Sequence, residues 1–134
     1  MKIPDILLMG TDIIIIDPEN EYQKMCEVFG GEFVSFSVSS EYKINPFELN
    51  KDNPEEDELS NKILNLHSLV KVIVGDITPS QDALLDRALV LAYKQKGITQ
   101  DPSTYQLEPP LLEDLYKVLL GFETPEAAEL ATRM

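Results

Sequence analysis

A chain of 134 residues, 43% of them apolar, is long enough for one domain and apolar enough for a core, which excludes a disordered acidic tail. Its 24 acidic and 11 basic side chains give a formal charge of -13, which disfavours the binding of nucleic acid. The charge instead predicts that the chain binds a basic partner or another part of a larger protein. One cysteine and one histidine exclude a disulfide framework and a cluster of Cys or His metal ligands, and no apolar run approaches the roughly 20 residues of a membrane span.

The first predicted elements are two strands with a helix between them. Residues 13–16 are four consecutive isoleucines, which predict a strand buried on both faces. Asp17 and Pro18 are typical of the start of a helix, and Gly30 and Gly31 are typical of the end of the same helix. The apolar face of that helix would consist of Tyr22, Met25, Cys26 and Phe29. Residues 32–37 predict the second strand, which completes a parallel βαβ unit.

The remainder of the chain is predicted to be irregular first and helical afterwards. Residues 38–51 contain the segment Ile44-Asn45-Pro46-Phe47, which is predicted to form a rigid turn. Three helix-start signals follow. They are Asn53-Pro54 with Glu56, Thr78-Pro79-Ser80-Gln81, and Thr124-Pro125-Glu126. A shorter helix is expected over residues 110–120, after a polar loop at 101–109.

Two apolar stripes identify the buried faces of the central helices. The first stripe is expected to consist of Leu59, Ile63, Leu66, Val70 and Ile73, with Gly75 ending the helix. The second is expected to consist of Leu85, Ala88, Leu89 and Ala92, with Gly97 as the stop. The sequence therefore predicts an α/β fold: a βαβ unit and the Asn-Pro-Phe loop over residues 1–52, then a helical insertion over 53–134.

A sheet of two strands is marginally stable by itself, and a strand made only of isoleucine is expected to have adjacent strands on both sides. We therefore expect the sequence to be a piece of a longer protein. The helical pattern that still runs at the last residue supports the same expectation.

Three segments in this order resemble one protein family. They are Gly10-Thr-Asp-Ile-Ile-Ile-Ile-Asp-Pro-Glu-Asn-Glu-Tyr22, Gly30-Gly31-Glu32-Phe33 and Ile44-Asn45-Pro46-Phe47-Glu48-Leu49. Together they resemble the conjugative-transfer and type IV secretion motor ATPases of the TraC/TraG/TrbE kind, in the HerA–FtsK branch of RecA-like P-loop ATPases. The resemblance extends over residues 1–134 and implies a partial RecA-like P-loop domain.

In such motors ATP and Mg²⁺ are held by a Gly-x-x-x-x-Gly-Lys-Ser/Thr loop, and the six glycines of this chain are not spaced to form one. The resemblance places the chain after that loop, with residues 1–9 as the last turns of the helix that leaves it. The Walker B strand and the arginine finger would lie beyond Met134. We therefore expect no cofactor-binding residue and no metal site in this piece.

The resemblance also implies partners and a location for the longer protein. It would act as a hexamer at the cytoplasmic face of the plasma membrane, with the rest of the motor domain, neighbouring subunits and secretion-channel proteins as partners. Direct binding of nucleic acid is not expected from this piece.

Asp17, Glu19 and Glu21 are the candidate catalytic residues, because a carboxylate cluster that follows a parallel strand lies where α/β folds place their sites. The structural interpretation is favoured: Asp17 caps a helix and the two glutamates complement its dipole.

Two other functions remain open on the sequence. One is a self-standing acidic protein-interaction domain without catalytic activity. The other, ranked last, is a small α/β enzyme that uses these carboxylates with a divalent metal.

Overall fold

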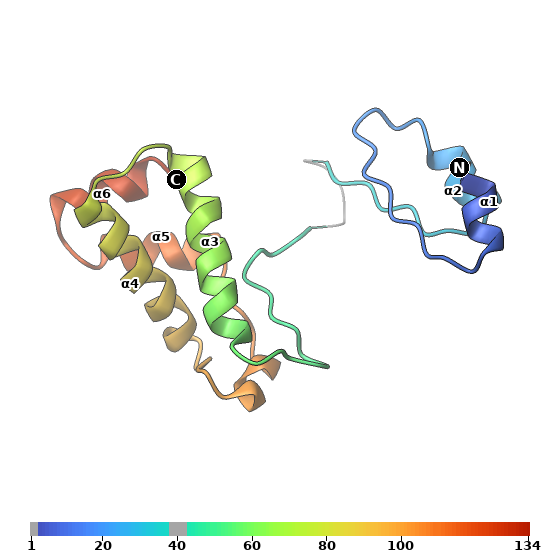
Figure 1. Cartoon of the computed structure of the whole chain (residues 1–134). Coiled ribbons are helices and arrows are strands. Elements are labelled where there is room, and N and C mark those ends of the chain that lie inside the picture. The colour runs from blue at the N-terminus through green and yellow to red at the C-terminus, as the bar shows by residue number, and fades with distance from the viewer. Residues whose placement is uncertain (1–2, 38–42) are drawn as a thin grey trace. The chain divides into compact units, whose positions relative to one another are not determined.

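The computed structural model describes residues 3–37 and 43–134, and the predictions for residues 1–2 and 38–42 lie outside them. The chain divides into two compact units, Met1–Lys43 and Ile44–Met134 (Figure 1). We call them the N-terminal unit and the helical unit. The Asn-Pro-Phe segment therefore belongs to the helical unit.

The N-terminal unit contains two short helices joined and followed by extended chain. Helix α1 spans Ile3–Leu8 and α2 spans Gln23–Val28. The expected helix before Gly10 is thus confirmed for its described residues, and Gly10 follows it with φ of 71°. Pro4 lies in the first turn of α1, where its missing N–H costs no hydrogen bond. Helix α2 begins five residues later than Pro18, the predicted start.

The predicted βαβ unit, and with it the α/β fold class, is wrong for the residues that the structure describes. Residues 11–17 and 31–37 are extended, yet neither segment is a strand and no sheet is present in ranges 3–37 and 43–134. A strand exists only where a neighbour exchanges backbone hydrogen bonds with it. Residues 11–16 make no backbone hydrogen bond to any described residue.

The isoleucine segment nevertheless retains the alternation of an extended chain. Ile14 and Ile16 are each 93% exposed, whereas Ile13 is half-buried and Ile15 is 42% exposed. Side chains of an extended chain point to opposite sides in turn. The expectation that this segment is buried on both faces is therefore wrong within the N-terminal unit.

The helical unit is built from four α-helices and one short 3-10 helix. These are α3 (Glu58–Val74), α4 (Pro79–Gln95), η1 (Pro102–Gln106), α5 (Leu112–Leu120) and α6 (Pro125–Thr132). Helix α4 packs against α3, α5 and α6, and α5 also packs against α6 (Figure 1). The predicted helices are confirmed, and η1 occupies part of the predicted polar loop.

The core of the helical unit lies where the apolar stripes predicted it. Its main contributors from α3 and α4 are Leu59, Ile63, Leu66, Val70, Leu85, Ala88, Leu89, Ala92 and Tyr93. Burial of such side chains stabilises a fold by about 25 cal/mol per Å² of apolar surface. Ile73, predicted to be buried, is 46% exposed, and Val74, four residues after Val70, packs against the core in its place.

Helix boundaries follow from local backbone chemistry. Thr78 and Gln81 form a reciprocal capping box at the start of α4, as predicted. Gly75 and Gly97 end α3 and α4 with φ of 77° and 80°, a conformation that glycine adopts without strain. Helix α3 begins four residues after Pro54, because Asp57 has a left-handed φ of 63° and cannot lie within a right-handed helix.

Candidate functional site

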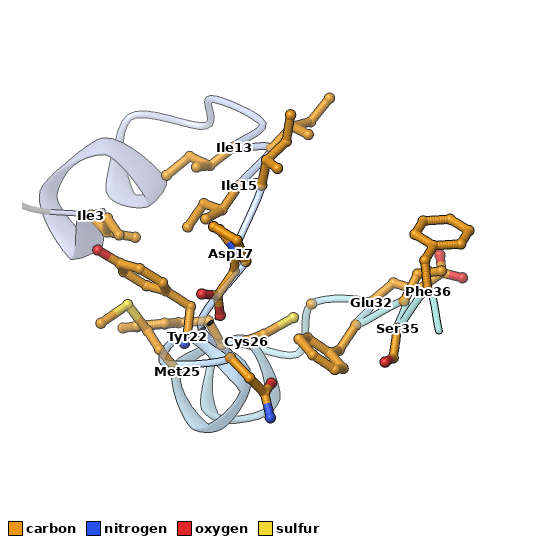
Figure 2. A pocket seen from close by; sticks show the side chains of 18 residues that line it. Ile3, Ile13, Ile15, Asp17, Tyr22, Met25, Cys26, Glu32, Ser35 and Phe36 are labelled. Atoms are coloured by element: carbon orange, nitrogen blue, oxygen red, sulfur yellow. Dashed lines mark hydrogen bonds between the residues drawn. The ribbon is translucent and has the colours of Figure 1, made fainter. Parts of the chain in front are cut away.

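A hollow with a volume of about 760 Å³ lies within the N-terminal unit. Figure 2 shows Ile13 and Ile15 on one side of it, and Tyr22, Met25 and Cys26 of the α2 region on the other. We call it the N-terminal hollow. Its remaining lining includes Ile3, Phe29, Phe33, Val34 and Phe36. The hollow is therefore apolar for most of its surface.

The predicted apolar face of α2 forms the floor of this hollow. Tyr22, Met25, Cys26 and Phe29 all line it, which confirms that they share one side of the helix. Their burial is incomplete, since Tyr22 is 38% and Phe29 47% exposed. Among the side chains that the structure places in the N-terminal unit, none is buried. The side chains that the structure places in this unit therefore do not enclose a core.

Asp17 is the one predicted site residue that reaches the N-terminal hollow. Its carboxylate Oδ2 accepts a hydrogen bond of 2.8 Å from the backbone N–H of Tyr22, the residue that precedes α2. That bond, reinforced by the backbone N–H groups of Glu21, Glu19 and Asn20, holds the pKa of Asp17 below its ordinary value of 3.8. Asp17 thus closes the turn that leads into α2. It is not the predicted cap of the helix, because α2 begins at Gln23 with Tyr22 as its N-cap residue.

Glu19 and Glu21 are exposed and do not line the N-terminal hollow. The turn that contains them includes Asn20 with a left-handed φ of 58°. Asp17 therefore closes this turn by itself, and the structure does not bring the three carboxylates together as one site. Their catalytic role stays a prediction.

The lining of the N-terminal hollow does not fit ATP with Mg²⁺. Phosphate groups require lysine, arginine or a cradle of backbone N–H groups, and no basic side chain lines the hollow. Within the described part of the chain, no group of three or more His, Cys, Asp or Glu could hold a metal ion. The hollow instead presents the surface of an incompletely covered apolar core.

The Asn-Pro-Phe segment acts as an anchor within the helical unit. The Asn45 side chain accepts a hydrogen bond from the Phe47 backbone N–H at 3.1 Å and donates one to the Pro110 carbonyl at 3.0 Å. The rigid turn is therefore confirmed, and it makes a tertiary contact in addition. Phe47 itself is fully buried.

The partner of Phe47 is a residue that the sequence alone did not single out. The hydroxyl of Tyr93 donates a 2.7 Å hydrogen bond to the Phe47 carbonyl, and the two ring centroids are 6.0 Å apart. Tyr93 follows Ala92 at the end of the second predicted stripe. An aromatic residue at this place could have indicated a packing partner, although not which one.

Comparison with known proteins shows similarity to a protein family and to a solved structure. The model of the TraG P-loop domain family matches residues 3–116. The structure of VirB4 of Thermoanaerobacter pseudethanolicus is similar, with 30% identity and a TM-score of 0.83. The match covers 97% of this chain and 36% of that one, so this chain spans about a third of VirB4. No curated protein matches.

Proposed function

The chain belongs to the TraG P-loop domain family of type IV secretion and conjugation motor ATPases, and on that premise we propose that it is a piece of an ATP-hydrolysing motor. The longer protein would energise type IV secretion or conjugative DNA transfer. The observation that carries the proposal is the family match over residues 3–116. The similarity to VirB4, at a TM-score of 0.83, supports it independently.

The chain by itself is inactive in this proposal. Phosphoryl transfer depends on a phosphate cradle and on ligands for Mg²⁺, and this sequence has no Gly-x-x-x-x-Gly-Lys-Ser/Thr segment. The N-terminal hollow offers no substitute, since its lining contains no basic side chain. ATP and Mg²⁺ would be bound by other parts of the longer protein.

The partners proposed for the chain are the rest of the motor domain, neighbouring subunits of a hexamer and secretion-channel proteins. The apolar N-terminal hollow supports the first of these, because exposed apolar surface of this kind is typical of an interface. Among the described residues no helix is long and apolar enough to cross a membrane. We place the longer protein in the cytoplasm, at the inner face of the plasma membrane.

Two measurements test the proposal separately. Phosphate release by the purified chain with Mg²⁺ and ATP should equal that of the heat-denatured chain, and turnover would overturn the proposed inactivity. In the host, in-frame deletion of the segment that encodes residues 1–134 should abolish secretion or DNA transfer. Undiminished transfer in a host without a second motor gene would overturn the proposed role.

A second candidate function rests on the helical unit. Its helices α3 to α6 enclose a core without help from the N-terminal unit, with Leu85, Leu89 and Leu115 fully buried. Such a unit is compatible with a self-standing acidic protein-interaction domain. Cooperative melting of the isolated helical unit, described in the Discussion, is the first requirement of this candidate.

A further inference from the structure

The isoleucine segment of the N-terminal unit has two open backbone edges. Residues 11–16 are extended, and their backbone N–H and carbonyl groups make no hydrogen bond to another residue of the described chain. Unpaired groups of this kind on an extended chain are a template on which a second extended chain can pair. Among the described residues, neither edge of the segment has such a partner.

The side chains of the same segment suit a pleated sheet. Residues 13–16 are all isoleucine, a β-branched residue that strands favour. Ile14 and Ile16 are each 93% exposed, so one side of the segment is an uncovered apolar ridge. Short segments of high β propensity that lack charge, glycine and proline are typical of chains that stack into cross-β assemblies. The four isoleucines meet each of these conditions.

We propose that residues 12–17 pair with the same segment of other copies of this chain, in a stack of strands roughly 4.8 Å apart. A single partner strand would complete one edge and leave the other open. A second copy presents the same two edges, so each added copy completes one edge and offers a new one. The exposed ridges of two such stacks would then pack face to face and remove Ile14 and Ile16 from water.

Two aspartates limit this pairing. Asp12 and Asp17 flank the isoleucines, so a parallel pair in register brings each carboxylate beside the same residue of the other copy. An antiparallel pair in register brings Asp12 beside Asp17. Like charges directly opposite each other destabilise a sheet in both arrangements. Asp17 accepts the Tyr22 backbone N–H, whereas Asp12 is exposed and is therefore the carboxylate that can be neutralised without disturbing the turn.

The net charge of -13 also opposes association of copies, but it is spread over the whole chain. Repulsion between exposed charges is screened beyond about 8 Å at physiological salt. Pairing of backbones acts at contact distance, and residues 13–16 carry no charge. Assembly should therefore be slow at low salt and faster at physiological salt, with the local aspartates as the remaining brake.

The experiment follows the full chain by thioflavin T fluorescence, below the melting temperature of the helical unit, and examines the product by fibre diffraction. We expect fibres with a reflection at roughly 4.8 Å. Asp12→Asn should shorten the lag time by about threefold or more, because it removes one pair of opposed like charges for each added strand. Asp52→Asn is the matched control, since it removes the same charge from an exposed position of the helical unit and should change the lag time less.

Two substitutions of Ile14 locate the pairing. Ile14→Pro removes a backbone N–H without changing the charge, and Ile14→Lys places a charge in the stack, so both should abolish the fibres. Val72→Lys is the control for the second variant, because Val72 is 82% exposed on α3 and gains the same charge outside the segment. Ile14 is almost completely exposed, so neither variant removes packing from the fold.

Four results would overturn the proposal. They are absence of fibres from both the original chain and Asp12→Asn, fibres from Ile14→Pro at the original rate, equal lag times of Asp12→Asn and Asp52→Asn, and fibres that form only once the helical unit has melted. Discrete dimers without the 4.8 Å reflection would likewise exclude a stack. The proposed motor function is tested by phosphate release and transfer, so either proposal can fail without the other.

Discussion

The hydroxyl of Tyr93 donates a hydrogen bond to the backbone carbonyl of Phe47, across 46 residues of sequence and inside the core of the helical unit. Both side chains are almost completely buried, with exposures of 1% and 0%. The bond satisfies a carbonyl that water cannot reach, and the tilted rings pack against each other. This contact fixes the Asn-Pro-Phe segment to the end of α4.

Tyr93→Phe should destabilise the helical unit by about 1–3 kcal/mol, because it leaves the buried Phe47 carbonyl without a donor. Urea denaturation followed by circular dichroism measures the loss. Tyr116→Phe is the control, since Tyr116 is 41% exposed and should change stability little. Burial also raises the pKa of Tyr93. The contribution of Tyr93 to the free energy of unfolding should therefore be complete at neutral pH and should decline as the pH rises above 10, the ordinary pKa of tyrosine. Equal stability of Tyr93→Phe and the original chain would contradict this role.

Asn45→Ala should cost about 1–3 kcal/mol, because it removes both the turn hydrogen bond to Phe47 and the bond to the Pro110 carbonyl. The free energy of unfolding in urea provides the measurement. Asn65→Ala, at an exposed position of α3, is the matched control and should be close to neutral. A cost no greater than that of the control would show that Asn45 does not anchor the segment.

Thr78→Ala should destabilise the helical unit by about 1 kcal/mol, since the hydroxyl accepts the Gln81 backbone N–H at the start of α4. The midpoint of thermal unfolding should fall accordingly. Ser80→Ala changes an exposed hydroxyl in the same turn and should have little effect. Comparable losses in the two variants would assign the effect to the turn as a whole rather than to the cap.

Asp17 should titrate below pH 3.8, because the Tyr22 backbone N–H stabilises its charged form. A carboxylate whose pKa is lowered by folding contributes stability above its ordinary pKa. That contribution is lost as the pH falls through the lowered value. The NMR shift of the Tyr22 amide should report this transition, which Asp17→Asn removes and Glu19→Gln leaves unchanged. A midpoint of this amide shift at pH 3.8 or above would contradict the hydrogen bond between Asp17 and the Tyr22 amide.

A protein comprising residues 44–134 should unfold in one cooperative transition with a near-ultraviolet circular dichroism signal. Its core is formed by its own helices, whereas the N-terminal unit has no buried side chain among those that the structure places. A peptide of residues 1–43 is the matched comparison and should show no such transition. Non-cooperative melting of the 44–134 protein would contradict an independent core and remove the interaction-domain candidate.

The helical unit was largely predictable because its signals are local. The Thr78-Pro79-Ser80-Gln81 start lies within four residues, and the buried stripe of α4 follows from its period. The start of α3 was missed, since nothing in the sequence indicated the left-handed conformation of Asp57. The Phe47–Tyr93 contact was missed for another reason: it joins residues far apart in sequence, and periodicity carries no information on such pairs.

The predicted strands failed because a strand depends on a neighbour, which the composition of Ile13–Ile16 does not supply. The candidate site was partly predictable. The sequence predicted Asp17 as the cap of a helix that starts at Pro18, whereas in the structure its carboxylate closes the turn before α2, beside the N-terminal hollow. It did not predict that Glu19 and Glu21 would remain outside the hollow, because the left-handed Asn20 sets the course of that turn.

Arg133 donates hydrogen bonds to the carbonyls of Val74 and Asp76, where α3 ends and the turn towards α4 begins. The bond to Val74 spans 59 residues of sequence. During synthesis on the ribosome, α3 and α4 therefore emerge well before the guanidinium that completes their shared turn. The turn between α3 and α4 can therefore complete its hydrogen bonding only after α6 and Arg133 have been synthesised.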